Sequence, residues 1–213
     1  MSQIVIRPGE TEFDVQHRIQ GALDLPLTER GRSQIQEIVK ELRGREIEVI
    51  YTSPNEPAFS TAKTLGEVLD IPVQSVPGLG NVHLGLWQGM CVDEIRRKQP
   101  RVFKQWEEQP EAICPPEGES CEDVYHRVSR GLKKPMRRDE PFAVVASEPV
   151  ATVILSVLRG TEPKFCGPDA CEAGRPLVEI VDSEAHRADD LVAAPGPTSS
   201  LSPFLWWRSV PQQ

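Results

Sequence analysis

Short continuous apolar runs alternate along the chain with apolar residues spaced three and four apart. The short runs, at 4–6, 47–51, 71–76, 142–146 and 177–181, are rich in β-branched residues and predict strands. The spaced patterns, within 28–44, 58–69, 120–132 and 150–160, predict helices with one buried face. Thr28 and Ser120 stand at helix starts as N-caps, and Gly44 and Gly160 stand at helix ends.

The order of these elements predicts an α/β fold. Strands that alternate with helices form βαβ units, so we expect a three-layer α/β/α sandwich with a mostly parallel sheet. Ligands bind at the carboxyl ends of the strands in such sheets. The segments 7–9, 53–54 and 147–148 each follow a predicted strand, so we expect them to converge on one pocket.

Composition narrows the partners and the location of the protein. Its 213 residues carry a net charge of −8, which argues against binding of nucleic acid or anionic membrane over the whole surface. The basic clusters at 96–104 and 133–138 are interleaved with acidic residues and are interpreted as solvated helix faces. No apolar run approaches the length of a membrane span, and the N-terminus lacks a signal-peptide pattern. Five cysteines without a CxxC pair fit reduced thiols in a cytoplasmic protein, and neither a metal nor a cofactor is expected.

The end of the chain differs in composition from the rest. Residues 192–200 are rich in turn formers and are typical of a linker, and residues 201–207 form a short apolar patch with two tryptophans. We therefore expect one domain over 1–182 and a C-terminal extension over 183–213. The patch either folds back over an apolar groove or is a short motif that binds a partner.

A series of short motifs follows the predicted elements. They are IRPGET (6–11), RIQG (18–21), LPLT (25–28), GRSQ (31–34), YTSP (51–54), TA (61–62), GLWQG (85–89), GES (118–120) and VV (144–145). In this order they make the chain similar to the histidine phosphatase superfamily, in its phosphoglycerate-mutase-like branch, over about residues 3–160.

The resemblance implies a site that this chain alters. In the family, a histidine after the first strand attacks the phosphoryl group, cationic groups stabilise the transferring group, and an acid protonates the leaving oxygen. The resemblance implies that six of these positions are substituted here, at Pro8 (nucleophile), Asp14 (asparagine), Pro57 (arginine), Asn81 (general acid), Ser147 (second histidine) and Glu148 (glycine). It leaves Arg7 and Arg18 for ligand binding.

These substitutions favour the hypothesis of an inactive protein. Loss of cationic groups and gain of carboxylates should make the pocket disfavour phosphate. We expect Ser147 to cap the helix that follows it, Glu148 to fill the anion position at that helix start, and Arg7 to pair with Asp14 or Glu148. The main hypothesis is therefore a phosphoglycerate-mutase-like pseudoenzyme, with no catalytic residues, that binds or regulates a protein partner or a small ligand.

The alternative hypothesis is an enzyme with different chemistry. A rewired hydrolase or phosphatase of small phosphorylated metabolites would use Asp14, Glu148 and His83 in place of phosphohistidine chemistry. Its requirement is that His83 and Asp14 come within hydrogen-bond reach. A metal site on the same three residues is a weaker variant, because no close ligand spacing supports it. The sequence leaves the partner and the oligomeric state open.

Overall fold

A five-stranded sheet runs through the centre of the protein. The computed structural model describes residues 2–168 and 177–182. The strands are β1 (Ser2–Ile6), β2 (Val49–Thr52), β3 (Val73–Ser75), β4 (Phe142–Val145) and β5 (Val178–Asp182), in the sheet order β3-β2-β4-β1-β5. β2, β3, β4 and β1 are parallel, and β5 pairs antiparallel with β1 at the edge. The predicted mostly parallel sheet is confirmed.

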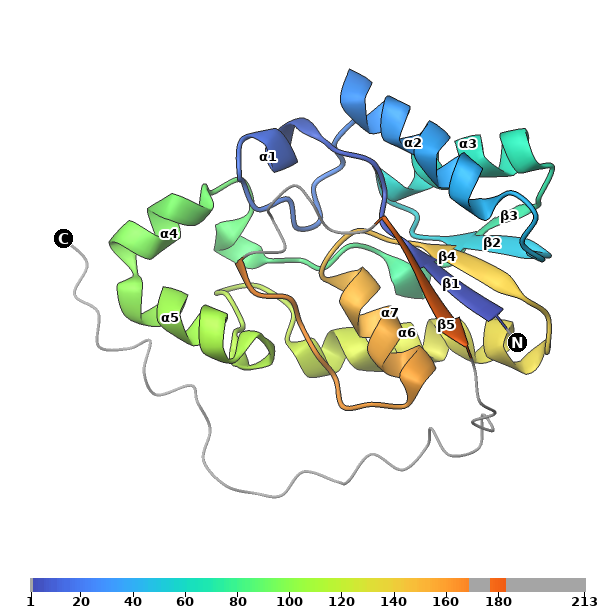
Figure 1. Cartoon of the computed structure of the whole chain (residues 1–213). Coiled ribbons are helices and arrows are strands. Elements are labelled where there is room, and N and C mark those ends of the chain that lie inside the picture. The colour runs from blue at the N-terminus through green and yellow to red at the C-terminus, as the bar shows by residue number, and fades with distance from the viewer. Residues whose placement is uncertain (1, 169–176, 183–213) are drawn as a thin grey trace.

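Helices cover both faces of the sheet. They are α1 (Glu12–Val15), α2 (Glu29–Leu42), α3 (Ala58–Leu69), α4 (Val92–Lys98), α5 (Pro100–Glu108), α6 (Cys121–Arg137) and α7 (Val150–Arg159), with short 3-10 turns at Pro77–Leu79, Gly85–Trp87 and Pro110–Ala112. α2 and α3 lie on one face and α6 and α7 on the other (Figure 1). The three-layer architecture is therefore as expected.

Successive side chains of β1 pack into two separate hydrophobic cores, one on each face of the sheet. Val5 packs in the cluster that contains the inner faces of α6 and α7. Ile4 and Ile6 point the other way and pack with α2 and α3. All three side chains are fully buried. Because successive side chains of a strand point to opposite faces, five residues of β1 are enough to join both layers.

The caps at three helix ends are local features that the sequence predicts and the structure confirms. The Thr28 hydroxyl accepts a hydrogen bond from the Gly31 N–H at 2.9 Å at the start of α2. The Ser120 hydroxyl accepts from the Asp123 N–H at 3.1 Å at the start of α6. Gly160 ends α7 in the left-handed region, at φ 62°.

α4 and α5 extend beside the sheet and have an aromatic core of their own (Figure 1). The ring centroids of Trp87 and Trp106 are 5.2 Å apart, and those of Phe103 and Trp106 are 6.1 Å apart. Arg96 lies over the Phe103 ring at 4.7 Å. Trp106 of α5 lines the candidate site.

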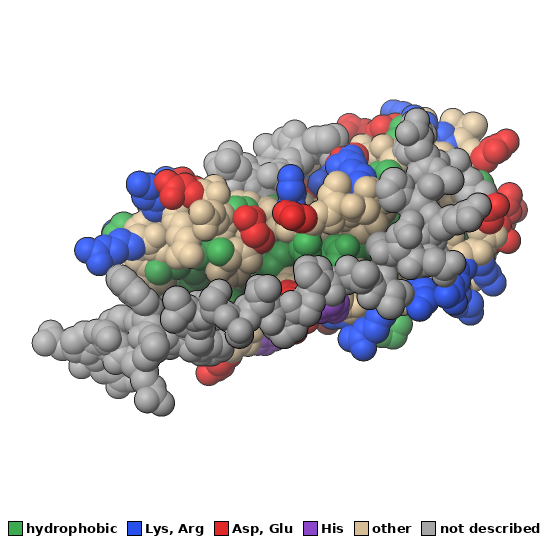
Figure 2. Space-filling model, turned by 90° about the horizontal axis from the view of Figure 1, so that it is seen from below, with side chains coloured by type: hydrophobic (Ala, Val, Ile, Leu, Met, Phe, Trp, Pro, Cys, Tyr) green, Lys and Arg blue, Asp and Glu red, His purple; other side chains and the backbone are tan. Residues whose placement is uncertain are grey.

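Three basic residues of the cluster on α4 and α5 pair with acidic residues of the same helices. Ion pairs join Arg96 to Asp93, Lys98 to Glu94, and Lys104 to Glu108, all between exposed side chains. In the described part of the face seen in Figure 2, basic and acidic side chains are interspersed. The interpretation of the 96–104 cluster as a solvated helix face agrees with these contacts.

The predicted extension at 183–213, its apolar patch and Cys171 lie outside the described residues. Three of the described cysteines, Cys91, Cys114 and Cys121, are free thiols. None of the described helices is both long enough and apolar enough to cross a membrane.

Candidate functional site

A cavity of about 440 Å³ opens at the carboxyl ends of β1 and β4. Residues 7–9 after β1 and residues 147–149 after β4 line it together, as the strand order predicts. Arg18, Asp14 and Pro57 line it as well. Ser53 and Pro54 do not, and the loop after β2 reaches the cavity through Pro57 instead. The expected convergence of strand ends is confirmed for β1 and β4.

Arg7 and Glu148, which both line the cavity, form an ion pair. Arg7 Nε donates to Glu148 Oε1 at 2.6 Å, and the two side chains are only 11% and 14% exposed. Arg7 Nη1 also lies 3.4 Å from Glu179 Oε2 on β5. Burial by itself would lower the pKa of Arg7, but the charge of Glu148, with that of Glu179, outweighs burial, so the pKa is raised. Arg7 is therefore a permanently charged group in this cavity.

The other oxygen of the Glu148 carboxylate lies at the start of α7. Oε2 accepts from the Thr152 N–H at 3.1 Å and from the Thr152 hydroxyl at 2.8 Å. The Ser147 hydroxyl is buried and has no hydrogen-bond partner among the described residues. The prediction that Ser147 caps this helix is wrong, because the carboxylate of Glu148 already satisfies the first turn.

Asp14 and Arg18 reach the cavity from the loop that holds α1. Asp14 Oδ2 accepts from the Thr11 N–H at 2.6 Å and from the Thr11 hydroxyl at 2.7 Å, which forms a capping box. Arg18 donates through Nη1 to the Gly89 carbonyl at 2.7 Å. Of the two carboxylates predicted as partners of Arg7, Glu148 is thus bound to it, while Asp14 is held by Thr11.

Asn81 and His83 are not among the residues that line the cavity. The Asn81 backbone N–H donates to Asn55 Oδ1 at 3.0 Å, and its side-chain amide donates to the Glu56 carbonyl at 3.3 Å. His83 Nδ1 lies 2.9 Å from the Glu117 carbonyl. The predicted grouping of His83 with Asp14 and Glu148 is wrong, because the loop of residues 80–84 holds His83 beside residues 117–119.

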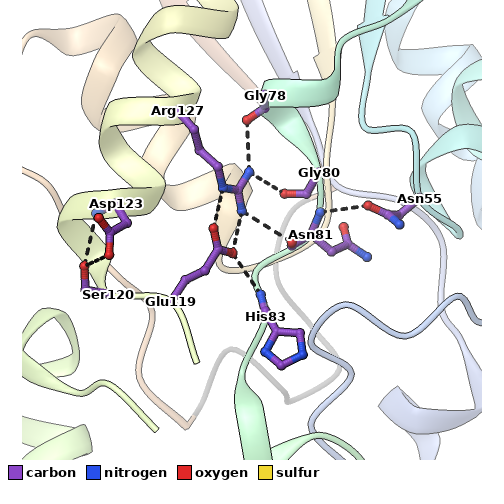
Figure 3. A network of polar contacts seen from close by, with 9 residues as sticks. All are labelled: Asn55, Gly78, Gly80, Asn81, His83, Glu119, Ser120, Asp123 and Arg127. Carbon is purple, nitrogen blue, oxygen red and sulfur yellow. Dashed lines mark hydrogen bonds and ion pairs between the residues drawn. The ribbon is translucent and has the colours of Figure 1, made fainter. Parts of the chain in front are cut away.

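A network around Arg127 fixes this loop to α6 (Figure 3). Arg127 donates to the carbonyls of Gly78 at 3.0 Å and Gly80 at 2.8 Å, and to that of Asn81 at 3.3 Å. It also binds Glu119, whose Oε2 accepts from the His83 N–H at 3.0 Å. The guanidinium of Arg127 therefore holds residues 78–81 against α6.

Three supporting residues escaped the sequence reasoning. Thr152 lies four residues after Glu148, so helical spacing could have revealed that pair. Arg127 stands beside the apolar stripe of α6, where a charged residue indicates a partner across the interface. Glu179 carries no such signal, because its approach to Arg7 depends on the antiparallel pairing of β5 with β1.

Comparisons with known proteins find relatives that are named as phosphatases. The phosphoserine phosphatase 1 of Hydrogenobacter thermophilus is 34% identical over 135 residues, which are 63% of this chain and 64% of that protein. The glucosyl-3-phosphoglycerate phosphatase of Mycobacterium tuberculosis is 35% identical over 152 residues, 71% of this chain and 67% of the relative. The matched stretches thus span about two thirds of these relatives.

Solved structures agree with the sequence matches. The Bacillus stearothermophilus YhfR structure superimposes with a TM-score of 0.71 at 28% identity and covers 86% of this chain and 91% of its own. The mycobacterial glucosyl-3-phosphoglycerate phosphatase superimposes with a TM-score of 0.68 at 28% identity, and the match covers 76% of this chain and 80% of that structure's chain.

These relatives correct the main functional hypothesis from the sequence. An inactive binding or regulatory protein was expected, but the relatives at 34% and 35% identity are named as phosphatases. Their names point to phosphatase activity and support the alternative hypothesis better. That hypothesis rested only on the side chains at the motif positions, which do not show which groups the folded cavity supplies.

A family model matches most of the chain. The model of the histidine phosphatase superfamily, branch 1, matches residues 3–170, which include every described element except β5. The order of motifs and the phosphoglycerate-mutase-like sheet agree with it. The chain belongs to the histidine phosphatase superfamily, branch 1.

Proposed function

We propose that this protein is a phosphatase that hydrolyses small phosphorylated metabolites in the cavity at the ends of β1 and β4. The observation that carries the proposal is that Arg7 and Arg18 line one cavity at this edge of the sheet. Guanidinium groups are the side chains best suited to bind phosphate oxygens. The phosphatase names of the relatives support the same reaction class.

The size and lining of the cavity support a small substrate. About 440 Å³ falls in the usual range of small-molecule sites. One part of the lining is an apolar wall that includes Leu84, Trp87 and Ile113, and the rest also holds charged residues such as Arg30 and Glu37. The phosphoryl group would bind at the arginines, and the alcohol part of the ester would lie against this apolar wall.

Position 8 determines the kind of hydrolysis that this proposal requires. Pro8 has no side-chain nitrogen, so no phosphohistidine can form there. We therefore infer direct attack by water: a water oxygen bonds to phosphorus, the bond from phosphorus to the ester oxygen breaks, and the products are the alcohol and inorganic phosphate. Asp14 lines the cavity and is the proposed acceptor of the proton from the water. Solvent supplies the proton to the leaving alcohol.

The test is hydrolysis of p-nitrophenyl phosphate and a panel of metabolite monoesters in isotopically labelled water. We expect release of phosphate that carries one labelled oxygen, with no trapped phosphoenzyme. Arg7→Met should lower kcat/KM by about 10²–10³-fold, because it removes a group that stabilises the transferring phosphoryl charge. Arg96→Met is the matched control, since Arg96 is exposed and pairs with Asp93 outside the cavity.

Two outcomes would overturn the proposal. One is an absence of phosphate release from every ester by folded wild-type protein. The other is an equal loss of activity in Arg7→Met and Arg96→Met. A cytoplasmic location, and a protein partner or a small ligand beyond the substrate, stay predictions from the sequence.

A further inference from the structure

The carboxylate of Glu148 stands between two groups that bind anions. On one side Arg7 Nε donates to Oε1 at 2.6 Å, and on the other the Thr152 N–H and hydroxyl donate to Oε2 at 3.1 and 2.8 Å. Thr152 lies in the first turn of α7, a helix of ten residues. A guanidinium together with the N–H groups of a helix start is the usual environment of a bound phosphate or carboxylate.

The residue before Glu148 offers a donor that this carboxylate does not use. Ser147 lines the same cavity, is 7% exposed, and its hydroxyl has no hydrogen-bond partner among the described residues. A buried hydroxyl without a partner is costly, so it marks a place where a polar ligand would be stabilised. A tetrahedral anion has more acceptor oxygens than a carboxylate and could bind Arg7 and Ser147 at the same time.

We infer that Glu148 is the residue that sets the affinity of this cavity for phosphate, because its carboxylate occupies the phosphate-binding position as a built-in anion. The inference deepens the proposed function and rests on it for the identity of the ligand. When a phosphate or phosphoryl group binds, it replaces the Glu148 carboxylate on Arg7. The displaced side chain then keeps its contacts with Thr152 or turns toward solvent.

The competition is uneven because Glu148 is part of the chain. A tethered group acts at an effective concentration that a free ligand must match, typically in the millimolar range for a short tether. Wild-type protein should therefore bind free phosphate weakly. A substrate overcomes this competition through contacts of its alcohol part with the apolar wall of the cavity, which inorganic phosphate cannot make.

The experiment measures binding of inorganic phosphate and orthovanadate by calorimetry, without any turnover. Glu148→Gln keeps the shape of the side chain and removes its charge, and we expect it to bind phosphate at least about tenfold more tightly. Arg7→Met in the Glu148→Gln background should lose that gain. Both results follow only if Glu148 and phosphate share Arg7.

Glu179→Gln is the matched control. Glu179 also pairs with Arg7, at 3.4 Å, but it lies on β5 and does not line the cavity. Glu179→Gln removes one negative charge near Arg7 but leaves the Glu148 carboxylate at the start of α7. We therefore expect the affinity for phosphate to rise by less than about threefold. Equal gains in the two variants would show a general charge effect and would overturn the inference. So would a folded Glu148→Gln protein that binds phosphate no better than wild type.

Thermal unfolding gives a second readout. Glu148→Gln should lower Tm, because Arg7 loses its ion pair with Glu148, and added phosphate should raise Tm more in this variant than in wild type. If Glu148→Gln does not fold, Glu148→Asp withdraws the carboxylate by one methylene and should show a smaller gain in phosphate affinity. No gain in that folded variant would also overturn the inference. Tighter phosphate binding without ester hydrolysis would refute the proposed function and leave this inference standing.

Discussion

The guanidinium of Arg127 binds both carboxylate oxygens of Glu119, from Nε at 2.8 Å and from Nη2 at 3.0 Å. The pair is partly buried, at 20% and 29% exposure, and Arg127 also donates to three carbonyls of residues 78–81. One side chain of α6 thus holds the loop that carries Asn81 and His83 (Figure 3).

Arg127→Met should therefore lower the free energy of unfolding by about 2–3 kcal/mol, because it removes the donor of three partly buried carbonyls and the charged partner of Glu119. Urea denaturation measures the change. Lys98→Met is the control, since its pair with Glu94 is exposed on α4 and should contribute about 0.5 kcal/mol or less. A similar loss of stability in both variants would contradict the stabilising role of the Arg127 contacts.

Gly31 lies in the first turn of α2, where alanine would ordinarily stabilise the helix by about 1 kcal/mol. Here a Cβ would collide with the carbonyl oxygen of Glu10 and lie 2.9 Å from its backbone nitrogen. Gly31→Ala should instead destabilise the protein by about 1–3 kcal/mol and shift the loop that follows Arg7. Urea denaturation should separate it from Ser33→Ala at an exposed position of the same helix. A stabilised Gly31→Ala protein would refute the close approach.

Cys121 should be inert toward thiol reagents at neutral pH. Burial, with a smaller effect of Glu111, raises the pKa of its thiol to about 12, so almost no thiolate is present. Alkylation followed by mass spectrometry should label Cys114, which is exposed, well before Cys121. Labelling of Cys121 at the rate of Cys114 would contradict the buried placement.

The same pKa shift predicts a loss of stability at alkaline pH. The unfolded chain releases the Cys121 proton near its ordinary pKa of 9.0, whereas the folded protein keeps it until about pH 12. Stability is therefore fully present below about pH 9 and falls as the pH rises toward 12. Cys121→Ala should show a shallower fall in urea denaturation measured across this window. Parallel curves for the two proteins would contradict the shift.

Much of the fold could be predicted because its signals are local. The apolar spacing in α2 and α7, and the caps at Thr28 and Ser120, act over a few residues, so they can be recognised without the partner elements. The helices α4 and α5 were interpreted only as solvated faces. Their apolar residues pack on Trp87 and each other in a separate cluster, which no single segment of sequence reveals.

The candidate site was also predicted in part from local sequence, and the rest depended on contacts between distant segments. The sequence identified the residues that line the cavity at the ends of β1 and β4, since parallel strands present their carboxyl ends at one edge. The alternative hypothesis required His83 to approach Asp14, but His83 contacts Glu117 and Glu119 and does not line the cavity.

By itself, the sequence determined the family, the order of elements and the absence of a nitrogen nucleophile at Pro8, because motifs and side-chain chemistry are properties of short segments. Only the tertiary structure decided that the Glu148 carboxylate lies on Arg7, 141 residues away, and that Ser147 is left without a partner. The contact between Arg7 and Glu148 depends on the pairing of β1 with β4, because these residues follow the two strands. Such a pairing is made by the packing of the whole sheet and by no local pattern.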